Sequence, residues 1–362
     1  MIPLVKTFLP PRDILMPELE KILYSGYIAQ GEQVDSFEQI FNEYIGAGNA
    51  LTLNSGTAAL HIALILAGVK EGDEVISTPL TAEPTNVAIK MVGGNIRYAD
   101  IDINTGSIDP KSIEKNINEK TKAILFVDYA GIPANIAAIF EISKKFKIPV
   151  IEDAAHALGA KFEGKRLGSH FPYTVFSFQA IKHMTTVDGG ILQIKDLQEF
   201  ERAKLIRWFG IDKKKTRLEN NIQEQGYKYH MNNINATIGI VQMKYIESVV
   251  SQYIENGKYF DEHLKGIPGL ELLEYYPNSE PSYWLYTLKV ENRDRLIKKL
   301  AEEGIAASEL HKRNDAHSFL NDYSEQLPNM NLFYEKMLHL PCGWWVDEKA
   351  REKIVSVISK GW

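Results

Sequence analysis

One lysine stands in a setting that can make it reactive. Lys182 lies in the run SFQAIKHMTTVDGG, which begins in a predicted strand and ends at a Gly-Gly turn. Burial among apolar neighbours disfavours the charged form of a lysine, and the free amine is then a nucleophile. Taken alone, a lysine is far more often an ordinary surface residue. The assignment therefore needs support from elsewhere in the chain.

Two further polar segments follow predicted strands. Asp153 ends the strand-like run VIED, and a carboxylate at the carboxyl end of a parallel strand points into the crevice where α/β sheets bind ligands. The turn NSGT, residues 54–57, lies between a strand and a helix, where unpaired N–H groups suit a phosphate. Each segment also has a plain structural explanation, because Asp, Ser and Thr are common helix caps.

Together the three segments meet the requirements of pyridoxal phosphate. This cofactor needs a phosphate cradle, an acid against its pyridine nitrogen and a lysine that binds its aldehyde covalently. Residues 54–57, Asp153 and Lys182 supply one requirement each. The conjunction outweighs the simpler explanation of each segment, and the sequence predicts a pyridoxal-phosphate enzyme.

An α/β domain must position these segments. Between residues 49 and 196, short β-branched runs alternate with runs of helical period, which is typical of a mostly parallel sheet covered by helices. The predicted strands are 50–54, 75–79, 96–100, 123–129, 149–153, 173–179 and 190–195. The predicted helices are 57–68, 84–92, 111–118, 134–146 and 198–208. We therefore expect a seven-stranded sheet.

The C-terminal part of the chain predicts a smaller α/β unit. A long helical pattern runs from about 232 to 265 and ends at Gly266. Beyond it we expect a strand over 283–290, a helix over 293–303 and a final helix over 347–359. The predicted division is a large cofactor-binding domain, residues 1–245, and a small domain, residues 246–362.

Composition excludes several classes of protein. The 362 residues carry a formal net charge of −6, which disfavours a protein that neutralises nucleic-acid phosphates. Cys342 is the single cysteine, so no internal disulfide can form. The first residues lack the apolar core of a signal peptide, and no stretch is apolar enough to span a membrane. We expect a cytoplasmic protein with neither nucleic-acid nor membrane partners.

Three other motifs fail on inspection. The run GAKFEGKR has the spacing of a phosphate-binding loop, but Arg166 stands where Ser or Thr should bind Mg²⁺, and the segment predicts a hairpin. The run DIDIN begins like a calcium loop but has Thr105 and Lys111 in place of the required Gly and Glu. No G-x-G-x-x-G follows a predicted strand. We predict no metal site.

Five segments give the chain a family resemblance. NSGTAAL, GDEVISTPLT, VIEDAAHALGA, SFQAIKHMTTVDGG and GYKYHMNNINATIG resemble, in order and spacing, the DegT/DnrJ/EryC1/StrS family of nucleotide-sugar aminotransferases. The resemblance extends from about residue 30 to about residue 345. It implies the fold type I aminotransferase architecture, with a seven-stranded large domain and a smaller C-terminal α/β domain. It also implies a homodimer whose active sites lie at the subunit interface.

The resemblance assigns roles by matched position. Lys182 would bind the cofactor covalently and Asp153 would pair with its pyridine nitrogen. His156 stands where the family often has Gln near the phenolic oxygen, although a core histidine without a role is an equal alternative. The phosphate would be held by Gly56, Thr57, Ser177 and, from the partner subunit, Lys228, which replaces the Asn of the family's G-x-N-x-R block.

The resemblance also implies the reaction. Glutamate would donate an amino group to a keto sugar linked to a nucleoside diphosphate, with a 4-keto-6-deoxy sugar first and a 3-keto sugar second. Relatives with His in place of Lys182 are sugar dehydratases, so Lys182 favours the aminotransferase. Candidate substrate residues are Tyr27, Gln30, His183, His311 and Arg313, and the basic run 213–217 is either a diphosphate site or a solvated loop. Ala82 stands where relatives often stack an aromatic ring on the cofactor.

Overall fold

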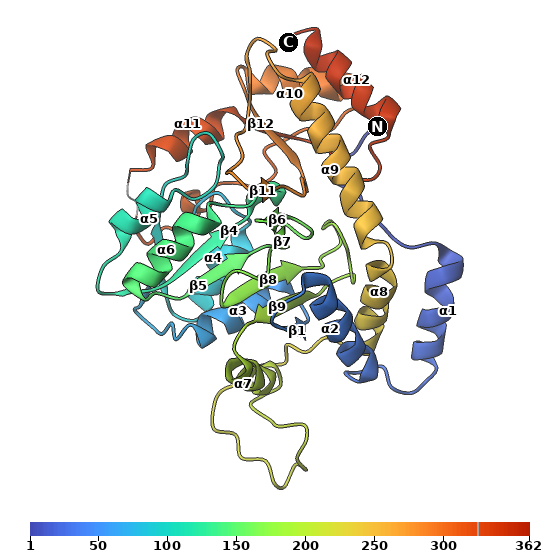
Figure 1. Cartoon of the computed structure of the whole chain (residues 1–362), viewed down its shortest axis with the longest axis vertical. Helices are drawn as coiled ribbons and strands as arrows, with labels where there is room; N and C mark the ends of the chain where they lie inside the picture. The colour runs from blue at the N-terminus through green and yellow to red at the C-terminus, as the bar shows by residue number, and fades with distance from the viewer. Residues whose placement is uncertain (324–325) are drawn as a thin grey trace.

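A single large sheet forms the centre of the molecule (Figure 1). The computed structural model describes residues 1–323 and 326–362. The sheet has seven strands in the order β1-β9-β8-β5-β4-β2-β3, which confirms the predicted number. Their bounds are Asn49–Leu53 (β1), Glu74–Ser77 (β2), Asn95–Tyr98 (β3), Thr121–Val127 (β4), Val150–Asp153 (β5), Tyr173–Ser177 (β8) and Gly190–Ile194 (β9).

The direction of β9 decides what gathers at one edge of this sheet. Strands β2, β3, β4, β5 and β8 pair in parallel, whereas β9 runs antiparallel to both β8 and β1. Gly190, the first residue of β9, pairs with Ser177 on one side and Leu53 on the other, each the last residue of its strand. Asp153, which ends β5, lies at the same edge. The three segments singled out in the sequence therefore meet there.

Helices cover both faces of the sheet. On one face lie α3 (Gly56–Leu66), α4 (Glu83–Met91) and α7 (Leu197–Arg207). On the other lie α2 (Glu32–Ile45), α5 (Pro110–Asn116) and α6 (Ile136–Phe146). Helix α3 is apolar on all sides, which is typical of a helix buried within a core. Helix α2 and the outer helix α1 (Arg12–Leu23) belong to an N-terminal segment in which no helix is predicted above.

The predicted helix over 232–265 is in fact two helices. Helix α8 (Asn233–Met243) ends before Lys244, and α9 (Ile246–His263) begins after Tyr245. The Tyr245 N–H bonds to the Gln242 carbonyl, a tighter i−3 pairing, and no Gly or Pro marks the break. Helix α9 then packs against the cores on both sides of the sheet and, further along, against the C-terminal core.

The C-terminal unit is a three-stranded antiparallel sheet with helices. Its strands run in the order β10 (Leu270–Leu272), β12 (Tyr286–Val290) and β13 (Met337–Leu340). Helices α10 (Arg293–Glu302), α11 (Pro328–Lys336) and α12 (Glu348–Ser359) accompany it. The predicted strand over 283–290 starts only at Tyr286, because residues 282–285 bond to the turn after β4. The domain boundary at residue 245 stays a prediction.

Two smaller features complete the fold. Strands β6 (Lys161–Phe162) and β7 (Lys165–Arg166) form the predicted hairpin, and β11 (Ser279–Glu280) pairs with β6. The first residues of the chain reach the C-terminal unit, where Ile2 forms a parallel bridge with Ile305 (Figure 1). Within the residues that the structure describes, none of the helices is long and apolar enough to cross a membrane.

A nearly buried ion pair ties α2 to α7. Arg207 Nη1 lies 2.7 Å from Glu38 Oε1, which also accepts hydrogen bonds from the Thr52 N–H and hydroxyl. Replacing Glu38 by Ala should lower the free energy of unfolding by about 3–5 kcal/mol, because Arg207 would keep a buried charge without a partner. Chemical denaturation monitored by circular dichroism measures the change.

The matched control is Glu201→Ala, which removes the partner of the partly exposed Lys204. Exposed pairs of this kind contribute about 0–1 kcal/mol, so the control should leave the denaturation midpoint nearly unchanged. Equal effects of the two substitutions would contradict the assignment.

Candidate active site

A pocket of about 390 Å³ opens at the sheet edge where these strands meet. Its walls come from the start of α3, the segment before α4, the ends of β5 and β8, and the loop between β8 and β9. His311 from the C-terminal unit closes one side. The pocket brings together seven of the residues predicted from the sequence: Gly56, Thr57, Asp153, His156, Ser177, Lys182 and His311.

Lys182 carries the nucleophile of the pocket. Its loop is held by hydrogen bonds from Lys182 N to the Gln179 carbonyl and from Thr186 N to the Phe178 carbonyl. Burial lowers the pKa of Lys182 to about 7, although the Asp153 carboxylate opposes this shift by favouring the ammonium form. A substantial fraction of the amine is therefore neutral near pH 7, as a nucleophile and proton carrier requires.

Asp153 supplies a buried carboxylate whose two oxygens are oriented by neighbours. It is 2% exposed. Oδ2 accepts a hydrogen bond of 2.8 Å from the Thr85 hydroxyl, and Oδ1 accepts one from Ala155 N. Burial raises the pKa of Asp153, while these two hydrogen bonds and Lys182 lower it. A positively charged N–H placed against this carboxylate would favour its ionised form.

His156 is held as a neutral ring. Its side chain is buried against the Trp284 indole, with ring centroids 4.1 Å apart, and burial holds the pKa of His156 well below its usual range. The Ala130 N–H donates to Nδ1 at 3.4 Å. We therefore assign the proton of the neutral imidazole to Nε2, which can donate to an oxygen in the pocket.

The start of α3 forms a cradle of small residues. Ser55 caps the helix by accepting from Ala58 N, and the N–H groups of the first turn have no partner within the helix. A Cβ added to Gly190 would lie 2.7 Å from Gly56 N, so only glycine allows β9 to pass so close to this turn. Unpaired N–H groups at a helix N-terminus suit a phosphate.

The pocket wall has no large aromatic ring at the position expected for one. Ala82 lines the pocket, in agreement with the departure noted in the sequence. Among the lining residues of the described chain, the rings are the imidazoles of His156 and His311, which lie parallel with centroids 5.9 Å apart. Glu83 lies beside them, 3.8 Å from His311 Nδ1.

Five predicted residues lie outside this pocket, and one of them, Gln30, lines a second pocket. Tyr27 and Lys228 are exposed, and the Lys228 carbonyl accepts from the Asn54 amide. Arg313 is already paired with Asp315. The expectation that His183 contacts substrate is corrected, because its ring is 1% exposed and packs on Tyr253. Alternation along the loop turns His183 into the core while Lys182 faces the pocket.

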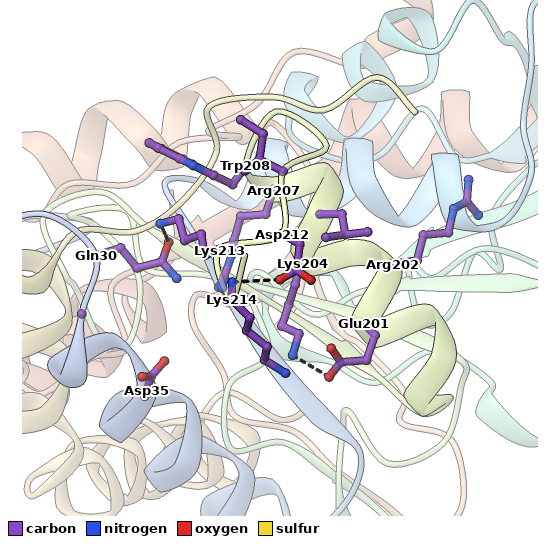
Figure 2. A pocket seen from close by; sticks show the side chains of 13 residues that line it. Gln30, Asp35, Glu201, Arg202, Lys204, Arg207, Trp208, Asp212, Lys213 and Lys214 are labelled. Atoms are coloured by element: carbon purple, nitrogen blue, oxygen red, sulfur yellow. Dashed lines mark hydrogen bonds and ion pairs between the residues drawn. The ribbon is translucent and has the colours of Figure 1, made fainter. Parts of the chain in front are cut away.

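Gln30 lines a second pocket, of about 680 Å³, together with part of the basic run (Figure 2). Figure 2 shows Gln30 and Lys213 pointing toward one another, and Lys213 Nζ donates to Gln30 Oε1 at 2.6 Å. The same amine lies 4.2 Å from the centre of the Trp208 ring. Lys213 is therefore ordered by two neighbours and is not simply a solvated side chain.

Thr85 and Trp284 are the contacts that sequence reasoning missed. Thr85 lies four residues after Thr81 and their hydroxyls are 2.7 Å apart, so a Thr pair at the start of a helix was the available signal. Trp284 lies over Lys182, with Nζ 4.1 Å from its ring centre. It is about 100 residues away along the chain, and nothing local links the two.

The residues present fit pyridoxal phosphate. The cradle of N–H groups suits its phosphate, the buried Asp153 suits a protonated pyridine nitrogen, and the Lys182 amine suits its aldehyde.

A sequence profile of the DegT/DnrJ/EryC1/StrS aminotransferase family matches residues 12–359. The chain belongs to this family. The resemblance inferred from five short segments is thereby confirmed, and the protein is an aminotransferase by family.

Two relatives of the aminotransferase carry named activities. The UDP-4-amino-4,6-dideoxy-N-acetyl-beta-L-altrosamine transaminase of Campylobacter jejuni is 31% identical, with 94% of each chain covered. The UDP-4-amino-4-deoxy-L-arabinose--oxoglutarate aminotransferase of Shewanella sediminis is 30% identical, covering 99% of this chain and 97% of that protein. Both names describe transaminases of UDP-linked amino sugars.

Solved structures share the whole fold. AtS13 from Actinomadura melliaura is 38% identical, with a TM-score of 0.97, and the match covers 100% of this chain and 99% of that one. The PLP-form structure of Spr1654 from Streptococcus pneumoniae is 26% identical, with a TM-score of 0.90, and the match covers 99% and 98%. The fold type I architecture predicted for the aminotransferase is confirmed.

The lowered pKa of Lys182 predicts its reactivity in the cofactor-free protein. Acylation of the Lys182 amine should reach half of its maximal rate near pH 7, because only the neutral amine reacts. Asp153→Asn should shift this midpoint to lower pH, since it removes the charge that favours the ammonium. Mass spectrometry of the Lys182 peptide across a pH series measures both midpoints.

Exposed Lys298 in the same samples controls for the pH dependence of the reagent. A Lys182 midpoint close to that of Lys298, or an upward shift in Asp153→Asn, would contradict the proposed electrostatics.

Proposed function

We propose that the protein is a pyridoxal-phosphate-dependent aminotransferase that moves an amino group from glutamate to a UDP-linked 4-keto-6-deoxy sugar. The observation that carries the proposal is the Lys182 amine, with a pKa of about 7, in one pocket with the buried Asp153. The names of two relatives, both transaminases of UDP-linked 4-amino sugars, support the nucleotide and the sugar carbon. The oxoglutarate in one of these names supports glutamate as the donor, because oxoglutarate is the product that glutamate leaves.

Besides Lys182, four groups of this chain hold the cofactor in this proposal. The first turn of α3, with Gly56 and Thr57, binds the phosphate together with the Ser177 hydroxyl. Asp153, oriented by Thr85, keeps the pyridine nitrogen protonated. His156 donates Nε2–H to the phenolic oxygen. When bound, the cofactor supplies the electron sink that makes a proton on the neighbouring carbon acidic.

Lys182 both anchors the cofactor and moves the proton. Because the pKa of its amine is near 7, the neutral form accepts a proton at Nζ and the ammonium form returns it without a large barrier in either direction. The apolar surroundings that lower the pKa also exclude water from the amine. His311 and Glu83, at the other side of the pocket, face the space left for the sugar.

The second pocket is the proposed site of the nucleoside diphosphate. Lys213 holds a positive charge beside Gln30, and the Trp208 ring offers an apolar face for a base. Tyr27, 79% exposed, lies near this segment of chain and is retained as a substrate contact. Charge-assisted hydrogen bonds of Lys213 with a diphosphate would contribute to binding and not to the chemical step.

A homodimer completes the proposal. The irregular segment 212–225 extends away from the body of the molecule below α7 (Figure 1). Leu218 and Ile222 in this segment are exposed. Apolar side chains this exposed favour burial against another chain. Lys228, exposed at the base of this segment, would then reach the phosphate of the partner subunit. Analytical ultracentrifugation tests the dimer, which should sediment with the mass of two chains. The cytoplasmic location stays a prediction.

Turnover should depend on Lys182. With added pyridoxal phosphate the protein should absorb visible light, and borohydride should remove this absorbance and add the cofactor mass at Lys182. Glutamate with a UDP-linked 4-keto-6-deoxy sugar should yield 2-oxoglutarate and the 4-amino sugar. Lys182→Ala should lower kcat at least about 10³-fold, because covalent and proton-transfer roles are lost together. Lys298→Ala, on the exposed face of α10, is the control.

Other outcomes separate the alternatives. Amination of a 3-keto sugar would show that the enzyme acts at C3. Loss of water from the sugar without formation of 2-oxoglutarate would indicate a dehydratase. A protein that stays colourless with added cofactor would refute the central claim.

Substrate affinity should depend on Lys213. Lys213→Ala should raise KM for the sugar nucleotide about tenfold, the effect of one charge-assisted hydrogen bond, and leave KM for glutamate unchanged. Lys215→Ala, at another exposed lysine of the same segment, is the matched control. Steady-state kinetics with each substrate varied in turn measures the two constants. Equal KM values for the sugar nucleotide in both variants would reject the second pocket as its site.

A further inference from the structure

The Trp284 indole forms a wall behind Lys182. The Lys182 Nζ lies 4.1 Å from the centre of the ring, and Trp284 is only 1% exposed. Trp284 is not among the residues that line the pocket. The amine therefore lies between the pocket on one side and an aromatic face on the other.

The segment that carries Trp284 forms hydrogen bonds with both residues adjacent to Lys182 in the chain. The Trp284 Nε1–H donates to the Ile181 carbonyl at 2.8 Å. On the other side, His183 Nε2 donates to the Ser282 carbonyl at 3.1 Å. The main chain of Lys182 is thus fixed before and after the residue by one segment, residues 282–284.

This segment is itself held in a strained conformation. Tyr283 has φ of +48°, a left-handed value that is costly for a bulky residue and persists only when its surroundings enforce it. The Tyr283 hydroxyl donates to Asp261 on α9 at 2.8 Å. Ser282 N donates to the Gly131 carbonyl, and a Cβ on Gly131 would lie 2.7 Å from Trp284 N. Contacts from α9 and from the turn at Gly131 therefore fix the segment of Trp284.

His156, another residue that lines the pocket of Lys182, also packs on the Trp284 indole. The His156 ring stacks on Trp284 with centroids 4.1 Å apart and an angle of 28° between the rings. Trp284 therefore supports two residues that face the cofactor in the proposed function, one through ring stacking and one through contact with an amine.

We propose that Trp284 is the positioning residue of Lys182, whose aromatic face receives the amine whenever the lysine is not covalently engaged. The inference rests on the proposed function. A lysine side chain has four rotatable bonds, so a free amine would otherwise leave the place where it must accept a proton. The negative face of the indole holds the ammonium form, and the hydrogen bond to Ile181 fixes the chain from which the side chain extends.

Two substitutions separate the ring face from the hydrogen bond. Trp284→Phe keeps an aromatic face and loses the N–H, whereas Trp284→Leu loses both. Trp345→Phe and Trp345→Leu are the matched controls, because Trp345 Nε1 also donates to a main-chain carbonyl, that of Pro3, at 2.8 Å.

The first measurement uses cofactor-free protein and the acylation midpoint of Lys182. Trp284→Leu should lower the midpoint by about 0.5–1 pH unit, because the aromatic face no longer stabilises the ammonium, and Trp284→Phe should lie between it and the wild type. The titratable groups that face the amine are kept in every variant: Asp153, His156, His183 and His311.

The second measurement is turnover of the holoenzyme. Trp284→Leu should lower kcat about 10²-fold with KM for the sugar nucleotide unchanged, since a misplaced amine affects proton transfer and not substrate binding. Trp284→Phe should recover part of this loss, and the Trp345 variants should match the wild type. If the Leu variant fails to fold, the Phe variant and its control carry the test.

Unchanged midpoints and kcat in both Trp284 variants would overturn the inference, and so would a rise in KM alone. Failure of the proposed function is distinguishable, because the wild-type holoenzyme would then lack turnover while the acylation midpoints of the cofactor-free protein would still respond to Trp284.

Discussion

The removal of water from the Lys182 amine is the condition on which the site depends. An exposed lysine would be almost fully protonated at pH 7, and neither bond formation nor proton transfer would proceed readily from it. Protein atoms replace much of that water: the β8–β9 loop carries the lysine, the Trp284 ring lies against the amine, and Asp153 is close enough to act on its charge. Asp153 must stay close enough to serve the cofactor, yet its charge favours the ammonium. Burial outweighs the charge of Asp153, so the pKa of Lys182 is lowered.

The sheet meets this condition through one reversed strand. Had β9 run parallel to its neighbours, its glycines would lie at the opposite edge and the loop that carries Lys182 would need a long crossover. Because β9 is antiparallel, the loop over 178–189 returns directly from β8 at the same edge of the sheet, and Gly190 passes within contact of the first turn of α3. The cradle and the lysine are therefore two consequences of a single change in strand direction.

Local sequence was sufficient for the features that lie at strand ends. The strands are short apolar runs, and the segments after β1, β5 and β8 carry Ser, Asp and Lys where a parallel sheet places its ligands, so their convergence was predictable. Thr85 and Trp284 were not, because their roles arise from contacts between distant parts of the chain. The break between α8 and α9 was missed because ordinary helix-forming residues occupy it. The role of His183 was wrongly predicted because its side chain is buried against Tyr253 in α9, a contact that the local sequence does not reveal.

The bridge between Ile2 and Ile305 has a consequence for how the chain is made. The first residues emerge from the ribosome long before their partner, and at about 5–20 residues per second they wait roughly 15–60 s for residue 305. During that interval the large sheet and the cradle of α3 can already assemble, since all of their strands precede residue 195. Trp284 and its segment arrive only near the end. The reactive amine is thus enclosed last, by the same part of the chain that captures the N-terminus.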